Sequence, residues 1–79
     1  MTQLHIGSTV RLAWTIKGKT YPPVVALLDA VDDLDGVKVA SLTRQGKTRE
    51  DGSAITYYLT EAEVNAMVPT THADDYITI

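Results

Sequence analysis

The sequence contains no cysteine and no phenylalanine, and it has a single tryptophan. Without cysteine, disulfides and thiolate metal sites are excluded, and small extracellular domains usually need such cross-links. We therefore expect the chain to fold in a reducing compartment. Without phenylalanine, the core must be built mainly from Val, Leu, Ile and Ala, with Trp14 and four tyrosines as the larger side chains.

Long apolar runs are also missing. No stretch approaches the roughly 20 apolar residues of a membrane span, and Met1-Thr2-Gln3 lacks the basic and then apolar pattern of a signal peptide. We predict a chain that is neither membrane-embedded nor exported by that route. Seven basic residues stand against ten acidic ones, a formal charge of −3, which argues against nucleic acid as a partner because like charges repel. The length of 79 residues predicts one domain, 1–79.

Motifs for catalysis or for a bound cofactor are absent from the sequence. The aspartates in residues 29–35 do not fit a calcium-binding loop, since apolar residues occupy two of its positions. His5 and His72 show no spacing typical of a metal site, and none of the serines sits in a strand-to-helix elbow. Gly46-Lys47-Thr48 lacks the upstream glycine of a phosphate-binding loop. We predict a protein that is not an enzyme and has no cofactor and no metal.

Alternating hydrophobicity is the strongest positive signal. Six apolar residues share the even positions of the first segment: Leu4, Ile6, Val10, Leu12, Trp14 and Ile16. A period of two predicts strands with these side chains on one, inward-facing side. We expect a bend at Gly7-Ser8 and a turn at Gly18.

Residues 24–35 admit two interpretations. Val24, Leu27, Leu28, Val31 and Leu34 fit one face of a helix. Four aspartates would then crowd the C-terminal half of that helix, where its dipole disfavours negative charge. A strand over 24–31, an acidic turn ending at Asp35-Gly36 and a second strand from Val37 are favoured instead, because Asp-Gly between Val-rich runs is typical of hairpins.

The second half predicts a hairpin, one helix and a last strand. Residues 44–52 contain no apolar side chain and form either a loop or the far end of a hairpin. Ile55, Tyr57 and Leu59 alternate as in a strand. The Thr60 to Glu63 spacing is that of a capping box, which predicts a helix over 61–68 ended by Pro69. A loop with His72 and Asp74-Asp75 then leads to a strand with Ile77 and Ile79 inward.

Six residues are candidates for an interface. Arg44, Lys47 and Arg49 form a basic loop that either contacts phosphate or an acidic protein patch, or is simply a solvated tip. Tyr58 points to the side opposite Tyr57, either as an interface anchor or at the rim of the core. Trp14 and Tyr21 are the candidates in an alternative interpretation of the fold, a small barrel with a peptide-binding groove.

The order IGSTVRLAWTI, hairpin, AITYYLTEAEVNAM and DDYITI resembles the small immunoglobulin-like domains of tailed-phage baseplate and tail-fibre proteins. The resemblance covers nearly the whole chain, with Leu59-Thr60 leading into a helical crossover and Tyr76 opening the closing strand. A Gly-Tyr pair is usual there, whereas Ala73-Asp74-Asp75 precedes Tyr76 here. The resemblance implies a mainly β, immunoglobulin-like β-sandwich with one short helix near the C-terminus, found in a virion or in the host cytoplasm. It also implies a structural component that attaches to a protein partner, with a homo-oligomer as one option.

Two alternatives stay open. The run VRLAWTIKGKTYPPVVALLDAV also resembles SH3-like or Tudor-like barrels, in which Trp14 and Tyr21 would line a groove for a peptide. A ring of Trp14 packed between sheets favours the sandwich, and a half-exposed ring facing Tyr21 favours the barrel. A small phage-encoded inhibitor of a host protein is the third reading, compatible with the acidic balance.

Overall fold

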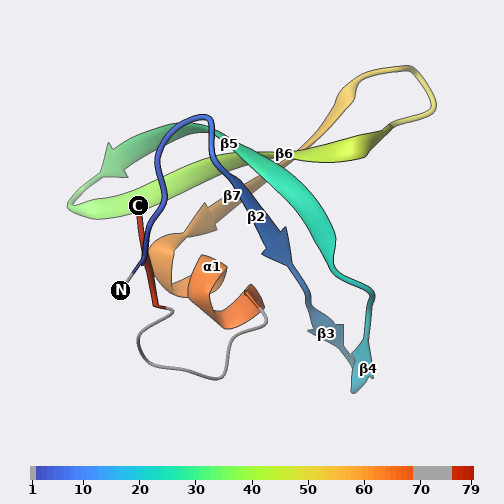
Figure 1. Ribbon diagram of the computed structural model, residues 1–79, viewed down its shortest axis with the longest axis horizontal. Coiled ribbons are helices and arrows are strands. Elements are labelled where there is room, and N and C mark those ends of the chain that lie inside the picture. Colours follow the sequence, from blue (N-terminus) through green and yellow to red (C-terminus); the bar gives the residue numbers. More distant parts are fainter. Residues whose placement is uncertain (1, 69–75) are drawn as a thin grey trace.

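The computed structural model describes residues 2–68 and 76–79 (Figure 1). In chain order, the elements are β1 (Thr2–Gln3), β2 (Thr9–Leu12), β3 (Thr15–Ile16), β4 (Lys19–Thr20), β5 (Val24–Leu34), β6 (Val37–Thr48), β7 (Ala54–Thr60), α1 (Glu61–Met67) and β8 (Ile77–Thr78). They form one four-stranded sheet and two sheets of two strands each, β1 with β8 and β3 with β4. The expected helix over 61–68 is confirmed. Pro69, His72 and Asp74-Asp75 lie outside the described residues.

The four-stranded sheet is antiparallel, in the order β2-β5-β6-β7. Its longest hairpin joins β5 to β6 through Asp35 and Gly36, whose φ angles are 54° and 85°. Positive φ at both central residues is the backbone of a type I′ turn, which suits the twist of paired strands and which Asp-Gly adopts readily. The strand interpretation of 24–35 is confirmed and the helical one is wrong. The strand also runs further than expected, because Asp32 and Asp33 lie within β5 and the turn starts only at Asp35.

A bulge divides β5 into two parts. Leu28 lies opposite Leu42, but Ala30 lies opposite Ser41, so that Asp29 has no partner of its own in β6. The extra residue shifts the alternation by one position and returns Val31 to the inner side of the sheet, where it packs against the core. Because of the bulge, β5 keeps its apolar side chains on the inner side even though their spacing in the sequence resembles that of a helix.

The inner face of this sheet packs against a second, smaller layer. That layer consists of α1 and the β1-β8 pair, which lie on the same side of the sheet (Figure 1). The core lies between the two layers, and its buried residues are Leu4, Val10, Leu12, Ala26, Leu28, Ala40, Leu42, Val64, Ile77 and Ile79. The fold is mainly β with several sheets and one short helix near the C-terminus, in a sandwich-like arrangement, as expected.

Two of the even-numbered residues of the first segment do not enter the core. Ile6 is 67% exposed, and Ile16 is 50% exposed. Ile6 lies in the turn that joins β1 to β2, and Ile16 lies in the β3-β4 hairpin, which extends away from the body of the domain (Figure 1). The inward prediction for these two side chains is therefore wrong, because a period of two orients residues only along a continuous strand.

Candidate interaction surface

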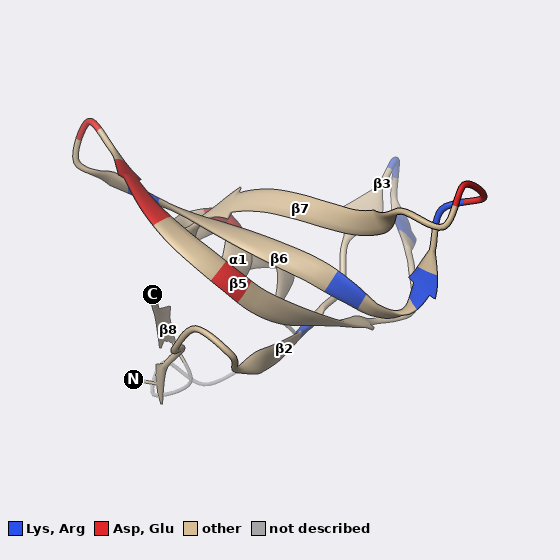
Figure 2. Ribbon diagram, turned by 90° about the horizontal axis from the view of Figure 1, so that it is seen from above, with Lys and Arg blue, Asp and Glu red and all other residues tan. Residues whose placement is uncertain are grey.

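The outer face of the four-stranded sheet carries the side chains that point away from the core. They alternate with the buried ones and come from all four strands: Thr9, Arg11, Val25, Leu27, Ala30, Asp32, Leu34, Val37, Val39, Ser41, Thr43, Thr56, Tyr58 and Thr60. Within residues 2–68 and 76–79, no element covers this face. Figure 2 views the sheet with α1 behind it.

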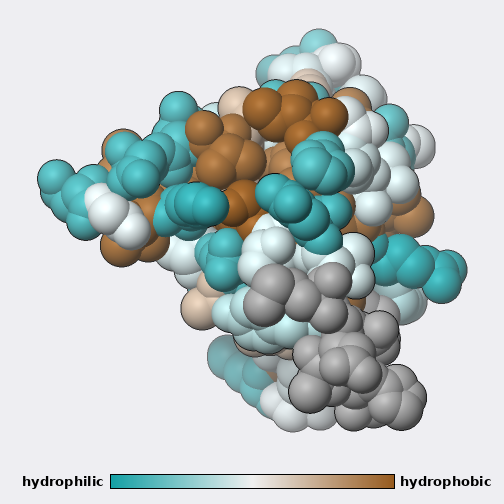
Figure 3. Space-filling model, turned by 60° about the vertical axis from the view of Figure 1, so that its left-hand side comes forward, coloured by the Kyte–Doolittle hydropathy of each residue, from teal (hydrophilic) through white to brown (hydrophobic). Residues whose placement is uncertain are grey.

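Apolar side chains are unusually prominent on this outer face. Tyr58 is 70% exposed, Leu34 59%, Val37 50% and Val25 40%, so four of the seven exposed large apolar residues of the described chain lie here. Figure 3 shows apolar surface beside hydrophilic surface on one side of the molecule. Exposed apolar area bordered by polar groups is typical of a protein-binding surface, and tyrosine is enriched among interface anchors. The outward orientation predicted for Tyr58 is confirmed.

The two ends of the sheet differ in charge (Figure 2). Asp32, Asp33 and Asp35 gather at the β5-β6 turn, whereas Arg44, Lys47 and Arg49 follow one another at the other end of β6. Between these ends, Asp29 accepts a hydrogen bond from the Thr43 hydroxyl. A partner that lies along the sheet would therefore meet aspartates at the β5-β6 turn and charges of both signs at the other end, where Glu50 and Asp51 follow the basic residues at the tip of the loop.

The basic residues do not form a single patch on one side of the sheet. Arg44 lies in β6 opposite Ala26 and is partly buried, whereas Arg49 lies in the loop beyond the strand. Gly46, with φ 81°, lies where the register between β6 and β7 shifts, between Thr43 and Thr48. Residues 44–52 form the far end of a long hairpin, one of the two forms expected. Their role in an interface stays a prediction.

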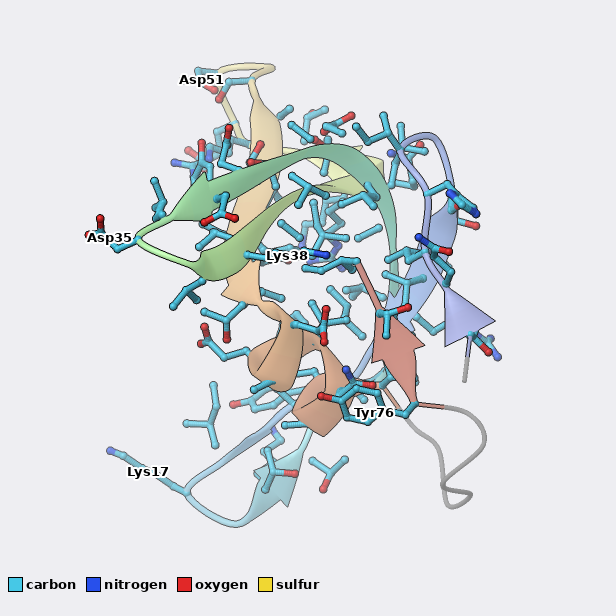
Figure 4. The ribbon with its side chains drawn as sticks, turned by 90° about the vertical axis from the view of Figure 1, so that its left-hand side faces the viewer. Lys17, Asp35, Lys38, Asp51 and Tyr76 are labelled. Atoms are coloured by element: carbon cyan, nitrogen blue, oxygen red, sulfur yellow. The ribbon has the colours of Figure 1, made fainter. Side chains whose placement is uncertain are left out.

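The tip of this hairpin is closed by Asp51. Its carboxylate accepts hydrogen bonds from the Ser53 hydroxyl at 2.6 Å and from the Ser53 backbone N–H at 2.9 Å. These bonds favour the charged form, the hydroxyl contributing most, and they lower the pKa of Asp51 below its ordinary value. Figure 4 shows Asp51 at the end of the loop, away from the helix.

Trp14 lies beside Tyr21 at the base of the β3-β4 hairpin, but the aromatic ring that it packs against is that of Tyr57. The Trp14 ring packs edge-on against Tyr57, with 5.6 Å between ring centroids and 62° between planes. Tyr21 donates its backbone N–H to the Trp14 carbonyl, and its ring lies 5.1 Å from the Lys19 ammonium. No pocket opens among the described residues. The Trp14 ring is partly buried and packs against the core on the Tyr57 side of the sheet, which favours the sandwich over the barrel.

The contacts that hold β8 are not predictable from any motif in the sequence. Asn65 of α1 donates its amide to the Ile77 carbonyl at 2.7 Å and accepts the Ile77 N–H at 2.6 Å. Glu61 accepts the Ile79 N–H at 3.1 Å. The Lys38 ammonium donates to the Ile79 carbonyl at 2.7 Å and points to it in Figure 4. Side chains here take the place of a neighbouring strand, which no local pattern of apolar and polar residues encodes.

The structure places no group of three or more histidine, aspartate or glutamate side chains suited to a cation within residues 2–68 and 76–79. In the same ranges, no helix has the length and apolar character needed to cross a membrane. The chain is thus a small, mainly β domain whose most distinctive surface is an uncovered sheet face. Comparisons with family models, curated proteins and solved structures found no match.

Proposed function

We propose that this chain is a non-enzymatic structural domain of a phage tail or baseplate protein, which attaches to another virion protein through the outer face of its four-stranded sheet. The observation that carries the proposal is Tyr58, 70% exposed on a sheet face that no described element covers. The resemblance to phage immunoglobulin-like domains is the reason for proposing a tail or baseplate as the assembly and another virion protein as the partner.

The outer face has the composition of an attachment surface. Tyr58 and Val25 present apolar area at low cost in side-chain entropy, and threonines surround them with hydrogen-bonding groups. The aspartates at the β5-β6 turn restrict how a partner can be oriented, since like charges brought together oppose docking. The partner that fits is a protein with an apolar strip and a basic group that meets the β5-β6 turn.

The test is co-expression with the products of the genes that flank its own, followed by measurement of the dissociation constant of any complex. Tyr58→Ala should weaken that complex by about ten- to hundred-fold, because buried aromatic anchors dominate interface energies. Tyr76→Ala is the matched control, since Tyr76 is also exposed (42%) but lies beside β8, away from the outer face.

The melting temperature of each variant shows whether Tyr58 is an interface anchor or a part of the core. Tyr58→Ala should leave it nearly unchanged. A complex that tolerates Tyr58→Ala as well as Tyr76→Ala, or a large loss of stability on Tyr58→Ala, would contradict the proposed role of this face.

A further inference from the structure

β7 is an open edge of the four-stranded sheet. It pairs with β6 on one side, and within residues 2–68 and 76–79 no strand pairs with its other side. The opposite edge strand, β2, has only four residues, and the chain beyond it is engaged, because Ala13 donates its backbone N–H to the Met67 carbonyl. The seven residues of β7 therefore form the longer free edge.

The composition of β7 lacks the usual protection of an edge. Proteins block free edges with charged side chains, proline or bulges, because an unprotected edge pairs with other strands. β7 reads AITYYLT, with no charge, no proline and no glycine. The irregular part of the β6-β7 ladder lies between Thr43 and Thr48, and the five pairs from Thr56 to Thr60 are regular. The stretch from Thr56 to Leu59 is a regularly paired edge without charged side chains of its own, and the Glu63 carboxylate lies only at its Thr60 end. Such an edge is suited to strand addition.

The hydrogen-bond pattern shows which backbone groups face outward. The Thr60 N–H donates to the Glu63 carboxylate of α1 at 3.0 Å, from which we infer that it faces away from β6. Because successive residues of a strand direct their N–H and C=O groups to alternate sides, Thr56 and Tyr58 also direct theirs away from β6. The free edge thus offers two full donor and acceptor sets, at Thr56 and Tyr58.

The sequence of β7 is suited to pairing with itself. In an antiparallel pair with a two-fold axis at Tyr57, Ile55 lies opposite Leu59 and Thr56 lies opposite Tyr58. Apolar inner-face residues then meet apolar ones, and outer-face residues meet outer-face ones, while Thr56 and Tyr58 exchange their free hydrogen bonds. A shift of one residue would place inner residues opposite outer ones, so the register is restricted.

We propose that β7 pairs antiparallel with β7 of a second copy of this chain, about a two-fold axis at Tyr57, to form a continuous eight-stranded sheet. The inference extends the proposed assembly function but uses the edge of the sheet, leaving the outer face open to a different protein. An interface of one strand pair is at the small end of protein interfaces, below about 1,200 Å². Self-association is therefore concentration-dependent.

Disulfide trapping tests the register directly, because the chain has no cysteine of its own. Thr56→Cys and Tyr58→Cys are prepared separately, mixed and oxidised mildly. In the proposed register, the two cysteines lie opposite each other with about 5.5 Å between Cα atoms, within the range of a disulfide. Position 56 lies about 7–8 Å from its own copy, as does position 58, so each variant alone should form little dimer.

The mixture should give a covalent heterodimer at least about tenfold faster than either variant alone. Equal rates, or no cross-linking of folded variants at about 1 mM, where a complex of about −4 kcal/mol would be half formed, would overturn the proposal.

A charge on the edge gives an independent readout. Thr56→Lys places a lysine on the free edge, and Thr9→Lys is the matched control on β2, the other edge strand, on the same face of the sheet. By sedimentation equilibrium, Thr56→Lys should raise the dissociation constant of the dimer about tenfold or more, since edge lysines block strand pairing. Equal dimerisation of both variants would contradict edge pairing.

The outcomes also separate the two proposals. If the disulfide does not form but Tyr58→Ala still weakens partner binding, only the self-pairing of β7 is refuted. If the disulfide forms but Tyr58→Ala does not weaken partner binding, only the attachment role of the outer face is refuted.

Discussion

Replacing Asn65 by alanine should unfold the C-terminal strand and destabilise the whole domain. The Asn65 amide bonds both backbone groups of Ile77, at 2.6 and 2.7 Å, and also donates to the Glu61 carbonyl at 2.9 Å. Ile77 is 6% exposed, so its N–H and C=O would be left without partners in a place that water reaches poorly.

The magnitude follows from these contacts. A buried polar group left unpaired costs about 1–3 kcal/mol, and two such groups appear on Asn65→Ala. The better helix propensity of alanine returns about 0.5 kcal/mol. We expect a net loss of about 1.5–5.5 kcal/mol, out of a total stability of about 4–12 kcal/mol for a domain of this size.

Thermal unfolding and amide exchange measure this loss. The melting temperature should fall by about 6–44 °C, and the amide protons of Ile77 and Ile79 should lose protection first. Ala66→Asn is the control, because Ala66 is exposed on α1 and the change costs only helix propensity, about 0.5 kcal/mol. A loss below about 0.5 kcal/mol for Asn65→Ala would refute the idea that side chains substitute for a strand here.

Three further outcomes are expected. Thr60→Ala removes one half of the capping box with Glu63 and should cost about 1 kcal/mol in urea unfolding, with no change if α1 does not depend on this cap. Ser53→Ala should raise the pKa of Asp51 toward its ordinary value in an NMR titration, since the hydroxyl bond is the largest cause of the lowering. Because the folded pKa is depressed, the bonds of Asp51 favour the folded hairpin above the ordinary carboxyl pKa, and this contribution is lost as the pH falls through the lowered value. The exchange rate of the Ser53 amide should rise with that protonation, and a rate independent of pH beyond intrinsic exchange would contradict it. Gly36→Val should destabilise the β5-β6 turn by about 1 kcal/mol or more, because φ 85° is strained for a branched side chain, and an unchanged urea midpoint would contradict the turn geometry.

Local chemistry accounts for the parts of the fold that could be predicted. The Asp35-Gly36 turn, the capping box at Thr60 and the alternation through Val10 and Leu12 depend on residues close together in the sequence, and all three are confirmed. The bulge at Asp29 was not foreseen, because it depends on how β5 fits against β6. Period-two alternation likewise failed for Ile16, which lies in a hairpin that has no layer packed against it.

The candidate surface could be predicted only one residue at a time. Alternation alone oriented Tyr58 outward, since its neighbour Tyr57 carries the inner position beside Trp14. The grouping of Tyr58 with Val25, Leu34 and Val37 on one face required the order of the strands, which the sequence does not state.

The parallel pairing of β1 with β8 determines how the domain responds to tension. Thr2 donates to the Tyr76 carbonyl and Leu4 to the Thr78 carbonyl, each at 2.8 Å. When the first residues of β1 and the last residues of β8 are pulled apart, two strands that run in the same direction slide past each other. All their hydrogen bonds must then break together, instead of one after another as in a peeled hairpin. Asn65, Glu61 and Lys38 bond β8 from its other side, so a force across the ends must break these side-chain hydrogen bonds as well as those to β1.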